Sequence, residues 1–147
     1  MFTINSIVTR GSSGSYYMKI GALAKQTGLS VQTIRFYEQA GLVSVPERTE
    51  GNYRLYDTES SRQLGFIKQC RNLGLTLHEI RELIKYQATP EEACGEINQI
   101  VDAHVLEVDA RIAELTTLRE QLISLRTQCN SSRSVKDCGI LKALTET

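Results

Sequence analysis

Three cysteines in the second half of the chain have the spacing of a shared soft-metal site. Cys94 and Cys129 are 35 residues apart, which is five whole heptads, and Cys138 follows after an eight-residue loop. On one helix Cys94 and Cys129 would share a face, but at about 1.5 Å per residue they would lie roughly 50 Å apart. Two antiparallel copies, however, would bring Cys94 of the partner subunit to Cys129 and Cys138. The spacing therefore predicts a metal site that exists only in a dimer.

The thiolate donors of this predicted site favour a soft ion. Three sulfurs with no fixed carboxylate prefer Pb(II), Cd(II), Hg(II) or Cu(I) to Mg(II) or Ca(II). Pb(II) suits three sulfurs because its lone pair can occupy the open side, and Hg(II) accepts three, whereas Cu(I) needs only two. Cd(II) prefers a fourth donor, and structural Zn(II) normally takes a closed set of four. His104 is a candidate auxiliary ligand, although a lone histidine in a helical seam is usually a packed polar residue.

The sequence indicates that these thiols are reduced. Residues 1–17 contain no apolar run of signal-peptide length, and no run of 18 apolar residues occurs in the chain. We therefore expect a cytoplasmic protein without a membrane segment, in which metal binding or redox chemistry is favoured over structural disulfides. Residues 1–17 are predicted to be a disordered leader, or an extension ahead of a start at Met18.

Residues 18–88 are predicted to form a winged helix-turn-helix. A short helix that begins near Ile20 should stop at Gly28, and Ser30 is a good N-cap for a second helix over residues 31–38. Two short helices joined by a tight turn make a helix-turn-helix. Residues 46–56, with a turn signal at Gly51-Asn52, predict the hairpin that forms the wing.

Two further helices are predicted behind the wing. Asp57 is an N-cap for one that runs to about residue 72, and Thr76 with Glu79 forms a capping box for the next, at residues 77–86. Cys70 lies on the apolar stripe of the first of these helices, and we interpret it as a buried core thiol.

The second helix and the wing carry the candidate DNA contacts. Residues 18–86 hold ten Lys or Arg against seven Asp or Glu, whereas residues 87–147 hold six against ten. A polyanionic partner is therefore indicated for the first part only. On the second helix, Ile34 and Phe36 are assigned to the core. The candidate contacts are Gln32, Thr33, Arg35 and Tyr37 on the helix, and Arg48, Asn52, Tyr53 and Arg54 on the wing.

Residues 89–129 are predicted to form one long dimerisation helix. Thr89 as N-cap with Pro90 at the first helical position is a strong start signal. A mostly apolar seam with alternating spacings of four and three residues, which also includes His104 and Arg111, then runs from Ile97 to Cys129. Such a helix is far longer than the head could cover, so the same helix of a second, antiparallel chain is the expected partner. Residues 130–147 remain as a metal-binding loop and a short C-terminal helix, which makes the predicted fold class mainly α.

Several of these stretches resemble a known family. Ile20-Gly-Ala-Leu-Ala-Lys25, Thr33-Ile-Arg-Phe-Tyr-Glu38 and Gly51-Asn-Tyr-Arg-Leu-Tyr56, together with the long helix, resemble the MerR family of transcriptional regulators. Residues 94–98 and 138–141 look most like its cadmium- and lead-responsive members, the CadR and PbrR regulators. The resemblance implies a homodimer on double-stranded promoter DNA that activates RNA polymerase by distorting the DNA when the metal binds. The family's monovalent-ion sensors have serine where Cys94 stands, so Cys94 implies a divalent ion.

Two alternatives remain beside a Pb(II) or Cd(II) regulator. A regulator that responds to Hg(II) or Zn(II) would use the same cysteines. A thiol-redox sensor on the same scaffold would instead form a disulfide or an iron–sulfur cluster. The family's superoxide sensor uses a tighter group of four cysteines, whereas only Cys129 and Cys138 lie near the helix end here. An enzyme is not indicated, because the sequence contains no nucleophile–base set and no phosphate loop.

Overall fold

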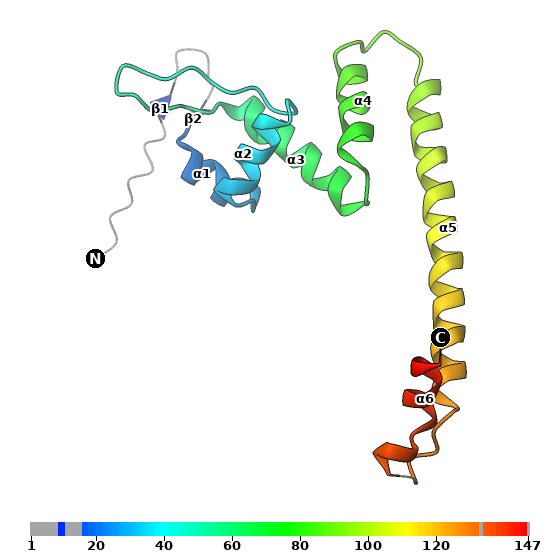
Figure 1. Cartoon of the computed structure of the whole chain (residues 1–147). Helices are drawn as coiled ribbons and strands as arrows, with labels where there is room; N and C mark the ends of the chain where they lie inside the picture. Colours follow the sequence, from blue (N-terminus) through cyan, green and yellow to red (C-terminus); the bar gives the residue numbers. More distant parts are fainter. Residues whose placement is uncertain (1–8, 11–15, 133, 147) are drawn as a thin grey trace. The chain divides into compact units, whose positions relative to one another are not determined.

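Helices carry most of the chain, which confirms the predicted mainly α fold (Figure 1). The computed structural model describes residues 9–10, 16–132 and 134–146, in two compact units that divide between residues 92 and 93. The first unit, called the head below, contains the short strands β1 (Thr9–Arg10) and β2 (Tyr16–Tyr17) and the helices α1 (Ile20–Thr27), α2 (Val31–Gln39), α3 (Thr58–Asn72) and α4 (Leu77–Gln87). The second contains α5 (Gly95–Arg126), the 3-10 helix η1 (Val135–Asp137) and α6 (Gly139–Thr145).

The strands β1 and β2 lie within the segment that was predicted to be a disordered leader. They pair antiparallel, with Thr9 opposite Tyr17 and Arg10 opposite Tyr16. Two successive tyrosines favour extended structure, which explains a strand at this point. The prediction is thus wrong for these four residues, and the rest of the leader lies outside the described residues.

The predicted helix-turn-helix is present in α1 and α2. Gly28 ends α1 in the left-handed conformation, with φ of 70°, a conformation that glycine adopts without steric cost. Lys68 of α3 donates from Nζ to the carbonyl oxygen of Thr27 at 3.0 Å. This bond satisfies one of the carbonyl groups at the end of α1 that have no partner within the helix. Ser30 caps α2 by accepting a hydrogen bond from the Thr33 amide at 3.0 Å.

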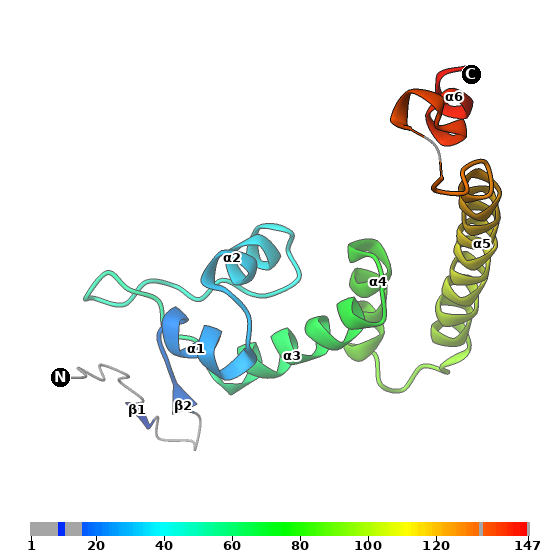
Figure 2. The same cartoon turned by 90° about the horizontal axis from the view of Figure 1, so that it is seen from below.

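Helices α1 to α4 of the head share one hydrophobic core. Figure 2 shows the course of these four helices. Leu23, Ile34, Leu64, Ile67 and Ile80 are fully buried and come one or two from each helix. Cys70 is buried in the same core, and this burial raises the pKa of its thiol. The structure therefore confirms Cys70 as a core residue.

The sequence prediction for the two faces of α2 is wrong at adjacent positions. Tyr37 is 7% exposed and belongs to the core, whereas Phe36 is 51% exposed. Residues three and four positions apart lie on the same face of a helix, so Tyr37 and Glu38 are buried on the same face as Ile34. Phe36, two positions after Ile34, points away from that face. We therefore leave Tyr37 out of the proposed DNA contacts.

The predicted wing is a minimal hairpin. Arg48 and Arg54 pair across it in an antiparallel bridge, and the Thr49 amide donates to the Tyr53 carbonyl oxygen at 2.7 Å. Asn52 occupies the turn with a φ of 61°, a conformation that asparagine tolerates better than most residues. The turn thus holds two arginines on opposite strands of the wing, as the sequence predicted.

Local capping signals position α3 and α4 as predicted. Asp57 accepts a hydrogen bond from the Ser60 amide at 2.9 Å at the start of α3. At the start of α4, the Glu79 amide donates to Thr76 Oγ1 at 3.2 Å, and the Thr76 amide donates to Glu79 Oε2 at 2.7 Å. Both halves of the capping box are therefore formed.

The long helix begins later than predicted. α5 spans 32 residues from Gly95 to Arg126, and Cys94 is its N-cap. Thr89 and Pro90 form only one turn, in which the Glu92 amide donates to the Thr89 carbonyl oxygen at 3.0 Å. A helix through this segment would place Gly95 in its interior, at a cost of about 1 kcal/mol, whereas a start at Gly95 avoids that cost.

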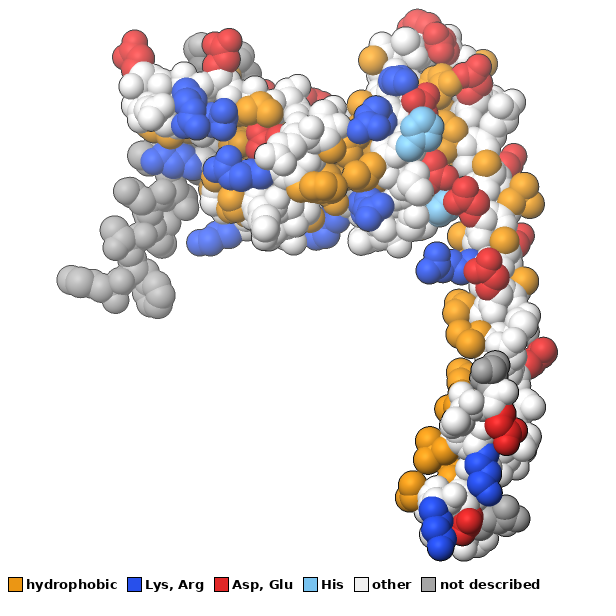
Figure 3. Space-filling model, viewed as in Figure 1, with side chains coloured by type: hydrophobic (Ala, Val, Ile, Leu, Met, Phe, Trp, Pro, Cys, Tyr) orange, Lys and Arg blue, Asp and Glu red, His pale blue; other side chains and the backbone are white. Residues whose placement is uncertain are grey.

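The apolar side chains of α5 are largely uncovered, and no residue of this helix is buried. Val101, Val108, Leu115, Leu118 and Leu122 of the predicted seam are each between 44% and 58% exposed. Figure 3 shows such side chains along the helix. Within the described parts of the chain, no helix combines the length and the apolar character that crossing a membrane requires.

Candidate metal centre and DNA-binding surface

Cys94 and Cys129 lie at opposite ends of α5. Cys94 occupies the N-cap position before its first residue, and Cys129 follows three residues after its last residue, Arg126. The 32 residues between these ends correspond to about 48 Å of helix. One chain therefore cannot bring the two sulfurs to one ion while α5 stays intact.

Cys138, in contrast, is brought to Cys129. α6 contacts α5 (Figure 1), and the side chain of Cys129 is close enough to that of Cys138 to act on its thiol. Gly139 allows this approach, because a Cβ atom at that position would overlap the carbonyl oxygen of Gln128. Arg126 donates from Nη1 to the Cys129 carbonyl oxygen at 2.6 Å and fixes the backbone on the other side. Two of the three predicted ligands are thus held together at one end of the helix.

The surroundings of Cys138 favour its thiolate form. The backbone N–H groups of Leu141 and Ile140 at the start of α6, and the side chain of Cys129, lower the pKa of the Cys138 thiol. The Leu141 amide contributes most, and partial burial opposes the shift. Since the thiolate is the metal-binding form of cysteine, this sulfur is prepared to bind a cation.

The third predicted ligand, Cys94, is exposed. The residues on both sides of it, from Glu91 to Glu96, are exposed as well. Its sulfur is therefore open to a group from another chain.

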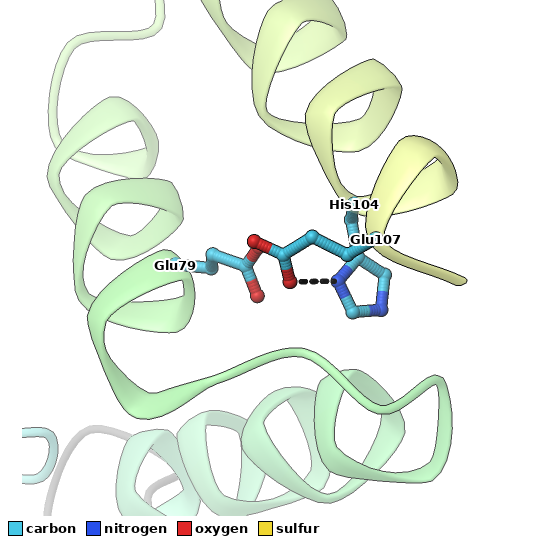
Figure 4. Close-up of side chains that lie close together, drawn as sticks. All are labelled: Glu79, His104 and Glu107. Carbon is cyan, nitrogen blue, oxygen red and sulfur yellow. Dashed lines mark ion pairs between the residues drawn. The ribbon is translucent and has the colours of Figure 1, made fainter. Parts of the chain in front are cut away.

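His104 does not lie with the cysteines. It is ten residues from Cys94 along α5, or about 15 Å, and 25 residues from Cys129. Its Nδ1 atom lies 3.9 Å from Glu107 Oε2, an i to i+3 ion pair when the imidazole is protonated (Figure 4). We therefore do not carry the predicted auxiliary role of His104 into the proposed ligand set.

The head concentrates cationic side chains around one shallow cavity of about 180 Å³. The wing contributes Arg48, Asn52, Tyr53 and Arg54, and α2 contributes Arg35, so five of the predicted DNA contacts meet here. Figure 3 shows Lys and Arg side chains gathered on the head. Clustered guanidinium groups with amide and phenol donors suit phosphate oxygens.

Sequence reasoning missed Lys19, which also lines this cavity. Its Nζ atom lies 4.6 Å from the centre of the Tyr53 ring, a cation–π contact between the start of α1 and the wing. A single lysine before a helix carries no signal of its own, so only the fold could reveal this contact. Gln32 and Thr33 lie at the start of α2 and do not line the cavity, and the Thr33 hydroxyl is engaged with Ser30 Oγ at 2.8 Å.

Comparison with known proteins identifies the family. Residues 18–87 match the family model for the MerR HTH family regulatory protein, and residues 61–125 match the model described as MerR, DNA binding. The HTH-type transcriptional regulator ZntR homolog of Haemophilus influenzae is 50% identical over 109 residues, which cover 74% of this chain and 81% of that protein. The chain belongs to the MerR family of transcriptional regulators.

Two solved structures of MerR-type regulators with bound metal resemble this chain. PbrR691 from Ralstonia metallidurans CH34, in complex with lead(II), is 46% identical, with a TM-score of 0.78, over 86% of this chain and 98% of that one. MerR from Bacillus megaterium MB1, in complex with mercury(II), is 28% identical, with a TM-score of 0.64, over 86% and 98%. The predicted MerR resemblance is therefore confirmed, and membership of this family makes the chain a transcriptional regulator and not an enzyme.

Proposed function

We propose that this MerR-family chain is a cytoplasmic, homodimeric regulator that responds to Pb(II) or Cd(II). In each site, Cys129 and Cys138 of one subunit bind the ion together with Cys94 of the partner subunit. The observation that carries this proposal is the pairing of Cys129 with Cys138 at one end of α5, while Cys94 caps the other end. An antiparallel dimer places the two ends together.

The surface of α5 supports a dimer. Its apolar seam residues are exposed from Val101 to Leu122, and a face of this kind is normally covered by another helix. A second copy of α5 offers the same seam, and the twofold symmetry of such a dimer would form two equivalent metal sites.

The donor set and the relatives together support the choice of ion. Three thiolates suit Pb(II), and PbrR691 was solved with lead(II). Cd(II) also favours thiolates and would add a fourth donor such as water. Hg(II) and Zn(II) are the alternatives, and the mercury(II) complex of the Bacillus megaterium protein favours testing Hg(II) beside Pb(II).

Anaerobic titration of the reduced protein with Pb(II), Cd(II), Hg(II) and Zn(II) tests the proposal. We expect tight binding of one ion per subunit, with a sulfur-to-metal absorption band for Pb(II). In a separate assay with RNA polymerase, the same ion should activate transcription. Cys70→Ala is the matched control, because Cys70 is buried in the head core and should not bind metal. Metal binding without a transcription response, together with a response to peroxide that consumes the Cys129 and Cys138 thiols, would favour a redox sensor instead.

On DNA, we propose that the cavity cluster contacts phosphates while the start of α2 reads bases. Arg54→Ala should weaken binding to all duplexes alike. The magnitude of the slope of log affinity against log salt decreases by about 0.9 for each phosphate contact that is removed. For a dimer with two altered heads, this magnitude should therefore decrease by about 1.8. Changes at Gln32 or Thr33 should instead alter base preference.

A salt titration of the binding affinity checks the role of Arg54. Arg62→Ala is the matched control, since Arg62 is an exposed arginine of α3 that pairs with Glu59 and does not line the cavity. An unchanged slope for Arg54→Ala would remove Arg54 from the phosphate contacts.

A further inference from the structure

The head buries one carboxylate in the part of its core that the structure describes. Glu38 of α2 is 8% exposed, and Tyr56, at the end of the wing, is 1% exposed. The Tyr56 hydroxyl donates to both carboxylate oxygens, at 3.1 Å to Oε1 and 3.2 Å to Oε2. Burial, followed by the charge of Glu38, raises the pKa of Tyr56 to about 12, so the phenol remains a protonated donor at neutral pH.

Tyr56 also connects the wing to the start of the head. Its amide and carbonyl groups both pair with Met18, at 2.8 Å in each direction. Its backbone thus holds the segment before α1, and its side chain holds α2. One residue therefore joins the three segments that supply the cations of the cavity.

Each anchor of this connection lies close in sequence to a cation. Lys19 follows Met18, Arg35 lies three residues before Glu38 on α2, and Arg54 lies two residues before Tyr56. The charges of Arg35 and Arg54 both act on the Tyr56 phenol. The spacing between these cations therefore depends on the geometry around Tyr56.

Packing alone does not account for a buried carboxylate. Apolar side chains of similar size would fill the same space without the cost of removing a charge from water. What the hydrogen bond adds is direction, because it weakens steeply when the angle or the distance between the wing and α2 changes.

We propose that Glu38 and Tyr56 are positioning residues, which hold the wing arginines and Arg35 at the spacing of DNA phosphates. The inference rests on the proposed DNA-binding function and adds to it two buried residues that would not touch DNA. Loss of their hydrogen bond should let the wing change its angle, so fewer phosphates would be bound at once.

The test uses the full-length dimer and a 30-base-pair duplex of arbitrary sequence, because phosphate contacts do not depend on sequence. In Tyr56→Phe we expect the salt slope to fall by about 1.8, the change that corresponds to one fewer bound phosphate on each head. Metal stoichiometry should stay unchanged. The companion variant Glu38→Leu/Tyr56→Phe removes both polar partners, so it should melt at a higher temperature than Tyr56→Phe while its salt slope stays low.

The outcomes separate positioning from stability. A wild-type salt slope in folded Tyr56→Phe would overturn the proposal. The proposal would also be wrong if the double variant regained both the stability and the salt slope of the wild type. If Tyr56→Phe does not fold, the salt slope of the double variant alone decides, and a wild-type slope in that variant would overturn the proposal.

Arg54→Ala, measured in parallel, distinguishes the positioning role from the DNA surface on which it rests. If Arg54→Ala keeps the wild-type slope, Arg54 does not contact phosphate and the proposed DNA surface fails at the wing. A lowered slope in Arg54→Ala alone rejects only the positioning role of Glu38 and Tyr56.

Discussion

Mixing Cys94→Ser subunits with Cys129→Ser subunits should restore metal binding that neither variant retains as a homodimer. Each homodimer lacks one of the three sulfurs in both of its sites. A mixed dimer has one site in which all three remain, because Cys94 comes from one subunit and Cys129 with Cys138 from the other. We expect each homodimer to lose more than about 100-fold in affinity, since even residues behind the ligands contribute 10- to 100-fold.

Subunit exchange followed by metal titration measures this effect. Mixtures of either variant with itself serve as controls, and the intact sites should appear only when the two variants are combined. Full metal affinity in a monomeric form of the protein, or in either homodimer, would show that one chain binds the ion alone and that the shared site is wrong.

Cys94→Ser should abolish activation by metal while DNA binding is retained. We expect the wild-type dimer to bind its operator with similar affinity with and without metal, and the DNA to become distorted at the operator centre only with metal. The physical requirement is modest, because a 100-fold preference of the metal for one of two dimer shapes corresponds to about 2.7 kcal/mol.

The chain offers a route for this switch. Cys94 caps α5, and residues 88–94 connect that helix directly to α4 of the head. Closure of the Cys129–Cys138 loop on Cys94 of the partner subunit would therefore act on the segment that connects α5 of that subunit to its head.

Footprinting at the operator centre and transcription from the same promoter are the measurements for this second prediction. A chemical probe of DNA distortion should react at the centre only with metal-loaded wild-type protein. The mechanism would be rejected if metal released the protein from the operator and transcription rose because the site was empty.

The sequence by itself determined the features that depend on neighbouring residues. Gly28, Ser30, Asp57 and Thr76 mark helix ends through their own backbone preference or through hydrogen bonds to amides three residues away. The separation of Cys94 from Cys129 likewise follows from the rise of a helix, so the prediction of a site shared with a second chain required no tertiary contact.

Only the tertiary structure decided which side chains meet across elements. Tyr37 and Phe36 are adjacent aromatic residues, and the packing of α2 against the core determined which one is buried. Lys19 joins Arg35 and the wing because the bridge between Met18 and Tyr56 brings distant segments together. The late start of α5 resulted from competition between a local start signal at Thr89 and the cost of an interior glycine.

The same division applies to the candidate metal centre. Sequence identified the three cysteines, but the close approach of Gly139 to Gln128 and the hydrogen bond from Arg126 to Cys129 determine that two of them are held together. Capping and helix rise are fixed within a few residues of the chain. Contacts between distant residues depend on packing, which a pattern of residue types constrains only loosely.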